Sequence, residues 1–423
     1  MKPVTAVKIL VFLSLWVTGS IISWNYSKKD LKRLSYYDVE GYYMYLPATI
    51  INGSFENLPV QTQVQFTNYP GTGKIFTKYT YGVAALLLPF FLIAHGITLL
   101  VNPAGADGYS FYYMMAIIVA AVFYMLLGLY LLYKTLAKRF STPVSLLVPL
   151  LILTGTNLYF YTICQPGMSH VYSFFLFAVV VFLTPKILAG APLKYWLMYG
   201  FTFGLIVVIR PTNCVLLLYP LLYGIYSLPL LAGRALYLIT AWRYILWAIV
   251  AFFIMFIPQL IYWKYISGSY IIYSYSNEGF LYWSSPKILQ VLFDVQNGWL
   301  LYSPLMVFAV IGLFFAIRQK VSAAVPLLAI LPLITYIFAS WWAWWFGGAF
   351  GHRCYIEYYA LLAFSLAAFI KAVGRNKYAS VAVFLLFGIC IYYNLMLTYL
   401  YFPPWDGPDW NWQRFSTVLQ KLL

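Results

Sequence analysis

Long apolar segments recur along this chain, and they constrain its fold more than any other feature. About eleven of them are near 20 residues in length, which is enough for an α-helix to cross a bilayer. Because a chain in lipid must satisfy its own backbone hydrogen bonds, the pattern predicts an all-α, polytopic membrane protein. The segments lie at about 7–24, 109–133, 143–163, 171–188, 195–209, 212–231, 241–266, 298–317, 322–340, 354–371 and 378–399.

The composition narrows the class of protein further. Hydrophobic residues make up 63% of the chain and charged residues 9%, which is typical of membrane proteins. The net charge of +16 does not indicate nucleic-acid binding, because the basic residues are spread over short loops. We expect a single membrane domain over residues 1–423, with a first outer loop at about 25–78, an outer tail at 401–423 and no separate soluble domain.

The stretch 79–101 decides the predicted topology, because it is long enough to cross but is interrupted by Pro89. If it crossed, the basic loop at 134–139 would lie outside, against the preference of cytoplasmic loops for lysine and arginine. We therefore expect eleven crossings plus a broken hydrophobic hairpin or juxtamembrane helices, with twelve crossings as the alternative. The segment 7–24 lacks a small-residue cleavage site and is expected to be a retained anchor. The amino terminus would then be cytoplasmic and all ten acidic residues external.

Two of those acidic residues, Asp38 and Glu40, lie in an aromatic stretch just beyond the first apolar segment. Ionisable residues at a membrane are functional candidates, although solvated loop acids or helix caps are the simpler alternative. In extended chain the two side chains would share one side, whereas on a helix they would be separated by roughly 200°. Asp38 and Glu40 are therefore both candidate site residues. A divalent metal held by both is left open.

Other candidates lie in the remaining outer loops of this topology. Lys74 and Lys78 follow a glycine-containing turn without the ending of a nucleotide-binding P-loop. Interfacial lysines are one interpretation of this pair, and contacts with a lipid phosphate are the other. His170 lies at the mouth of a crossing, where no catalytic triad can be argued from it. Arg210 precedes a proline at a helix junction and would be held close to the membrane.

A tryptophan- and glycine-rich turn at 341–353 is the most distinctive outer stretch. Tryptophans alone would form an aromatic belt, but glycines let a ligand approach the backbone closely. The indole faces of Trp344 and Trp345 suit a sugar ring. Arg353, preceded by His352, offers a planar fork to an anionic oxygen. We therefore interpret this turn as part of a ligand site.

The order of several motifs along about residues 5–400 carries a family resemblance. The motifs are the acidic first outer loop and the stretches 69–72, 86–91, 168–170, 210–212, 298–304 and 344–353. Together they resemble bacterial integral-membrane glycosyltransferases of the GT-C superfamily, whose members include protein O-mannosyltransferases and the aminoarabinose transferases of lipid A. The resemblance implies a sugar donor on a polyprenyl phosphate and a first-loop acid as general base. Because it places this acid at the start of the loop, Asp38 is the first candidate for the base and Glu40 the second. Here the acids read Asp-x-Glu instead of adjacent Asp-Glu.

The resulting hypothesis is a glycosyltransferase of the bacterial inner membrane with its active site facing the periplasm. It would move one sugar from a polyprenyl-phosphate donor to a glycan, lipid or protein acceptor, among membrane lipids and without nucleic acid. The donor phosphate would meet Arg353, His352, Arg210, Lys74 or Lys78, and the sugar or acceptor would meet Trp344, Trp345, His170 or Tyr37. A lipid-linked-sugar flippase or transporter is one alternative, and an oligosaccharide polymerase or ligase is the other.

Overall fold

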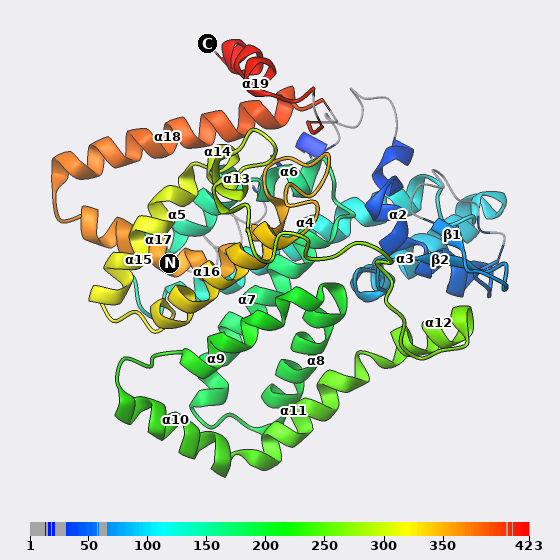
Figure 1. Cartoon of the computed structure of the whole chain (residues 1–423), viewed down its shortest axis with the longest axis horizontal. Helices are drawn as coiled ribbons and strands as arrows, with labels where there is room; N and C mark the ends of the chain where they lie inside the picture. Colours follow the sequence, from blue (N-terminus) through cyan, green and yellow to red (C-terminus); the bar gives the residue numbers. More distant parts are fainter. Residues whose placement is uncertain are drawn as a thin grey trace.

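The computed structural model describes residues 13, 16, 17, 19–21, 31–56, 58, 66–402, 405–407 and 409–422. Most of the expected crossing at 7–24 and part of the first outer loop therefore lie outside the described residues. Helices dominate the described part, and its strands form one short antiparallel hairpin of β1 (Phe66–Asn68) and β2 (Ile75–Thr77). The expected all-α class is confirmed (Figure 1).

The long helices pack side by side in a bundle, with α15 on α17, α11 on α8, and α4 on both α7 and α3. Short helices connect them or cover one end. The long helices are α3 (Gly82–Val101), α4 (Phe111–Leu136), α5 (Thr142–Thr154), α7 (Ser169–Leu188), α8 (Leu193–Ile209), α10 (Leu228–Thr240), α11 (Trp242–Ile254), α12 (Ile257–Ser267), α15 (Leu305–Arg318), α16 (Ala324–Ser340), α17 (Tyr359–Val373) and α18 (Lys377–Leu400). The short ones are α2 (Asp38–Tyr43), α6 (Leu158–Ile163), α9 (Leu218–Leu222), α13 (Ile288–Phe293), α14 (Trp299–Tyr302) and α19 (Trp412–Leu419).

Five helical stretches in the described residues are long and apolar enough to cross a membrane. This number supports a membrane protein, while the count of eleven crossings stays a prediction. The five stretches are Gly82–Val101, Phe111–Leu136, Ser169–Leu188, Trp242–Ser267 and Lys377–Leu400.

Several expected crossings are not single helices, and three of them are clearly interrupted. The segment 143–163 divides into α5 and α6 after Thr154, and 298–317 divides into α14 and α15 around Ser303 and Pro304. The segment 212–231 begins as a 3-10 helix, η4 (Pro211–Leu217), and ends its helical course at Leu222 before α10. Glycine and proline at these points interrupt the helical hydrogen bonds, and hydropathy alone does not register such breaks.

The expected broken hairpin at 79–101 is wrong, because α3 continues through the exposed Pro89 as one helix. A proline removes a single backbone hydrogen bond, which a helix can accommodate with a local adjustment. The α3 helix packs on the first half of α4, where Phe91 meets Tyr113 and the Tyr124 hydroxyl donates to the Leu86 carbonyl. Tyr124 also meets Tyr172 of α7, on which α4 packs as well. The α3 helix also packs beside α2 (Figure 1), and whether α3 crosses the membrane or lies along its surface stays a prediction.

Candidate functional site

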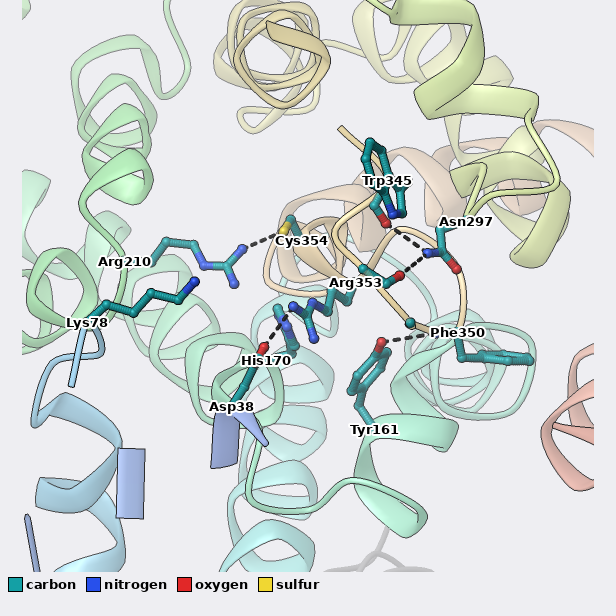
Figure 2. Close-up of polar contacts among 12 residues, drawn as sticks. Asp38, Lys78, Tyr161, His170, Arg210, Asn297, Trp345, Phe350, Arg353 and Cys354 are labelled. Atoms are coloured by element: carbon teal, nitrogen blue, oxygen red, sulfur yellow. Dashed lines mark hydrogen bonds and ion pairs between the residues drawn. The ribbon is translucent and has the colours of Figure 1, made fainter. Parts of the chain in front are cut away.

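Polar side chains from segments far apart in the sequence meet in one group (Figure 2). They come from α2, from the start of α7, from the end of α8 and from the 3-10 turn η5 (Arg353–Tyr355). The longest of these connections joins Asp38 to Arg353.

The Asp38 carboxylate accepts a hydrogen bond of 2.8 Å from Nη2 of Arg353. Both side chains are largely buried, with exposed fractions of 18% and 17%. Burial alone would lower the pKa of Arg353, but Asp38, together with neighbouring tyrosine and cysteine side chains, raises it above its ordinary value. Arg353 is therefore a permanent cation, and Asp38 is its carboxylate partner.

The α2 helix holds Asp38 in a tight setting. A Cβ added to Gly41 would overlap the Tyr79 ring, and one added to Gly167 would overlap Val39 of α2. Tyr37, which caps the helix, has a φ of 57° and is 64% exposed. A tyrosine in this backbone region is strained, and such strain often accompanies functional sites. Close packing on two sides thus fixes where Asp38 points.

Glu40 does not lie beside Asp38, because the stretch is helical and the two side chains leave α2 in different directions. Glu40 is fully buried. Its charge adds to burial in raising the pKa of Tyr109, which precedes α4. The described residues contain no group of three or more His, Cys, Asp or Glu side chains that could hold a metal ion. The helical alternative of the sequence analysis is the one observed, and it makes Asp38 the accessible acid.

A second carboxylate, Glu357, lies just before α17 and is completely buried. His170 Nδ1 is 3.4 Å from it and Arg210 Nε is 3.8 Å from it, while Arg210 also donates to the sulfur of Cys354 at 2.6 Å. Burial raises the pKa of Glu357 to about 7, although Arg210 acts in the opposite direction. Each arginine of the site is thus placed next to its own carboxylate.

Glu357 was absent from the candidates that the sequence suggested. The signal was nevertheless present, since Glu357 is an acid within the apolar segment 354–371. An ionisable residue in such a segment is a functional candidate.

The two candidate lysines lie in different surroundings. Lys78 forms an ion pair of 2.6 Å with Glu278 and lies 5.6 Å from the Tyr275 ring centre. The pKa of Tyr275 is raised mainly by burial, and it also responds to Arg210 and Asp38, so this ring borders the charged group. Lys74 instead donates to the Tyr265 carbonyl at 2.9 Å, away from that group.

Hydrogen bonds fix the tryptophan-rich turn that precedes Arg353. Asn297 donates to the carbonyls of Trp345 and Gly347, both at 2.8 Å (Figure 2). A ring nitrogen of the fully buried His352 lies 3.1 Å from the Trp344 carbonyl. Burial lowers the pKa of His352 to about 3, so its ring is neutral at physiological pH. The indole rings of Trp344 and Trp345 are both half-buried.

The structure therefore brings Asp38, Arg353, Arg210 and His170 together, with Lys78 at the border. Trp344, Trp345 and His352 belong to the turn that positions Arg353, and Tyr37 lies exposed next to Asp38. Lys74 and Glu40 face other surroundings. The roles suggested for these residues in binding and catalysis stay predictions.

The fold and the site define an α-helical membrane protein with a charged, largely buried group of side chains. No protein-family model and no curated protein matches the chain.

Proposed function

We propose that the protein is a glycosyltransferase of the GT-C type. It transfers a single sugar from a polyprenyl-phosphate donor to an acceptor hydroxyl at the periplasmic face of a bacterial inner membrane. The observation that carries this proposal is the pair of Asp38 and Arg353 next to a second guanidinium, Arg210, in a largely buried setting. Such a site offers a base and two phosphate-binding forks beside each other.

The charge balance of this site suits a phosphodiester. Three cations, Lys78, Arg210 and Arg353, are accompanied by the carboxylates of Asp38, Glu278 and Glu357. When Glu357 is protonated, as burial favours, one net positive charge remains. A donor phosphodiester carries one negative charge, so its binding would neutralise the group.

Donor binding and base activation are coupled in this proposal. The donor phosphate competes with Asp38 for the Arg353 guanidinium, because both are anionic acceptors of the same N–H groups. As the phosphate takes over Arg353, the Asp38 carboxylate is released toward the acceptor. In the free enzyme the base, Asp38, is therefore held in an ion pair with Arg353 until a donor is bound.

The transfer step then needs no further group. The acceptor oxygen attacks the anomeric carbon, the bond from that carbon to the phosphate oxygen breaks, and the acceptor proton passes to Asp38. Polyprenyl phosphate leaves with the bonding electrons, and Arg353 and Arg210 stabilise the charge that develops on it. The products are the glycosylated acceptor and polyprenyl phosphate.

The position of the charged residues supports transfer over transport. A flippase needs polar groups along a path through the bilayer. Here the charged side chains gather near the start of α7 and the end of α8; they are Asp38, Glu357, Arg210 and Arg353. A polymerase or ligase would bind a diphosphate donor, and two arginines with carboxylate partners suit a monophosphate better.

Mass spectrometry of the lipid that copurifies with the full chain tests the proposal. We expect a monophosphate-linked sugar, with less of it on the Arg353→Ala variant. The same preparation should release polyprenyl phosphate when acceptor is added. A diphosphate-linked oligosaccharide would indicate a polymerase or ligase, and movement of the intact donor between leaflets without its cleavage would indicate a flippase.

A further inference from the structure

A surface cleft of about 590 Å³ lies outside the charged site, between the β1–β2 hairpin and the loop that follows α12. This volume falls within the range that small-molecule ligands occupy. The residues that give the cleft its chemistry are Thr67, Asn68, Tyr69, Phe76, Tyr273 and Ser276.

The lining combines aromatic rings with uncharged polar groups. Tyr69 and Phe76 meet edge to face at 5.8 Å, and Tyr273 is 66% exposed, with its hydroxyl donating to the Glu278 carbonyl at 2.5 Å. None of the described residues that line the cleft is charged. A sugar ring has an apolar C–H face and a rim of hydroxyls, so it fits aromatic faces bordered by amide and hydroxyl groups. The absence of charge in this lining favours a neutral sugar.

The strand β2 separates the cleft from the helix that carries Asp38. Its middle residue, Phe76, faces the cleft, while the neighbouring Ile75 and Thr77 are buried on the opposite side. A Cβ on Gly41 of α2 would lie 2.7 Å from the Thr77 hydroxyl oxygen. Side chains of a strand alternate between its two faces, so one strand supports both the cleft and the candidate base.

The loop after α12 also borders both the cleft and the charged group. Tyr273 and Ser276 line the cleft, whereas Tyr275 borders the charged group. Two bonds attach this loop to the chain after β2. Ser274 donates to the Lys78 carbonyl at 3.0 Å, and Lys78 pairs with Glu278 at 2.6 Å. The cleft and the charged group therefore share two walls.

We propose that this cleft binds a neutral oligosaccharide, the chain of the acceptor whose terminal hydroxyl is glycosylated at Asp38. This inference rests on the proposed function, because the transferase supplies the reason for an acceptor. It adds the chemical class of that acceptor, a carbohydrate as opposed to a lipid or protein. The aromatic residues hold the sugar rings, and Asn68 and Ser276 meet their hydroxyls.

Direct binding tests the cleft without any transfer reaction. The full chain in nanodiscs is titrated with the neutral tetrasaccharides chitotetraose and maltotetraose. Tetragalacturonate serves as a negatively charged tetrasaccharide of the same length. Binding is measured by saturation-transfer NMR and calorimetry. We expect at least one neutral tetrasaccharide to bind at millimolar or lower concentration. Tyr273→Ala should weaken that binding about tenfold or more, since an exposed aromatic contact is lost. Tyr69→Leu should weaken it as well.

Tyr270→Ala is the matched control, because Tyr270 is 60% exposed on the same loop but does not line the cleft. It should bind the saccharide as the unaltered protein does. Failure of every neutral saccharide to bind would overturn the proposal. So would equal binding of tetragalacturonate, or equal losses in the Tyr273 and Tyr270 variants. Size-exclusion profiles establish that each variant is folded.

The two proposals fail in different ways. If saccharides bind at the cleft but no sugar is transferred from a lipid phosphate, saccharide binding by the cleft is supported and the glycosyltransferase proposal is refuted. If transfer occurs and its KM for acceptor is the same in Tyr273→Ala as in the unaltered protein, the cleft proposal falls and the glycosyltransferase proposal stands.

Discussion

Arg353 and Asp38 are 315 positions apart in the sequence, yet Nη2 of the arginine lies 2.8 Å from Oδ2 of the aspartate. The carboxylate therefore engages one of the five N–H groups of the guanidinium. In the proposed mechanism, a phosphate that takes over the Arg353 guanidinium releases this carboxylate to accept a proton.

We predict that Asp38→Asn abolishes sugar transfer while donor binding is kept or becomes tighter. The amide retains the shape of the side chain but loses its basicity, which costs about 10²–10⁴ in rate. Arg353 also loses its competing carboxylate. Single-turnover transfer and donor titration measure the two effects separately.

Glu56→Gln serves as the control for this variant, because Glu56 is an exposed acid of the same loop. It should transfer sugar at the normal rate. Near-normal turnover of Asp38→Asn would refute the assignment, and an inactive Glu40→Gln with an active Asp38→Asn would move the base to Glu40.

A second prediction concerns the charge-conserving change Arg353→Lys. Lysine keeps the charge but loses the bidentate geometry, and a missing partner in a largely buried site costs on the order of 2–4 kcal/mol. Donor use should therefore fall by roughly 30-fold to 1000-fold. Arg375→Lys, at an exposed arginine, should leave kcat/KM for the donor unchanged. Normal donor use by Arg353→Lys would make this residue an interfacial anchor only.

The buried Glu357 predicts a pH dependence of stability. Its pKa is raised from 4.5 to about 7 by burial, so the folded state holds the proton more tightly than the unfolded state does. The resulting stabilisation, up to about 3 kcal/mol, is fully present below pH 4.5 and is lost as the pH rises through 7.

Thermal unfolding of the detergent-solubilised protein at several pH values checks this expectation. Glu357→Gln removes the ionisable group and should flatten the decline in Tm around neutral pH. The Glu278→Gln variant, at a partly exposed acid, should keep that decline. An identical pH profile for Glu357→Gln and the unaltered protein would contradict the prediction.

A fourth prediction concerns the packing of α15 on α17, the helix that follows Glu357. A Cβ added at Gly312 would overlap the carbonyl oxygen of Ser365, so Gly312→Ala should force the two helices apart. Such overpacking costs about 1–3 kcal/mol. Gly388→Ala is the matched helical control, since nothing lies within 4 Å of its added Cβ. It should be neutral or stabilising by up to about 1 kcal/mol, and equal melting temperatures for the two variants would argue against the close contact.

The last prediction concerns the topology of α3. If α3 lies along the membrane surface, Ala137→Cys and Asn376→Cys should both be protected from an impermeant thiol reagent in intact cells. A cysteine-free background is needed, because Cys214 is exposed. Labelling at both positions would indicate that α3 crosses and that the chain has twelve crossings, because the eight crossings expected between positions 137 and 376 keep the two on the same side.

The all-α membrane class could be predicted from the sequence, because hydrophobic run length is a local property and lipid permits few structures. Arg210, His170, Asp38 and Arg353 could be proposed for a similar reason. Each is an ionisable residue at the edge of an apolar segment, which is visible without knowing its neighbours.

Other features depended on the tertiary structure. The pairing of Asp38 with Arg353 and the approach of Glu357 to Arg210 arise from packing between distant segments. A local sequence pattern does not indicate which distant residues come into contact. The helical form of α2, which separates Glu40 from Asp38, and the continuity of α3 through Pro89 were likewise settled by neighbouring contacts. Tertiary packing can override local preference, since each local choice differs by only about 1–3 kcal/mol.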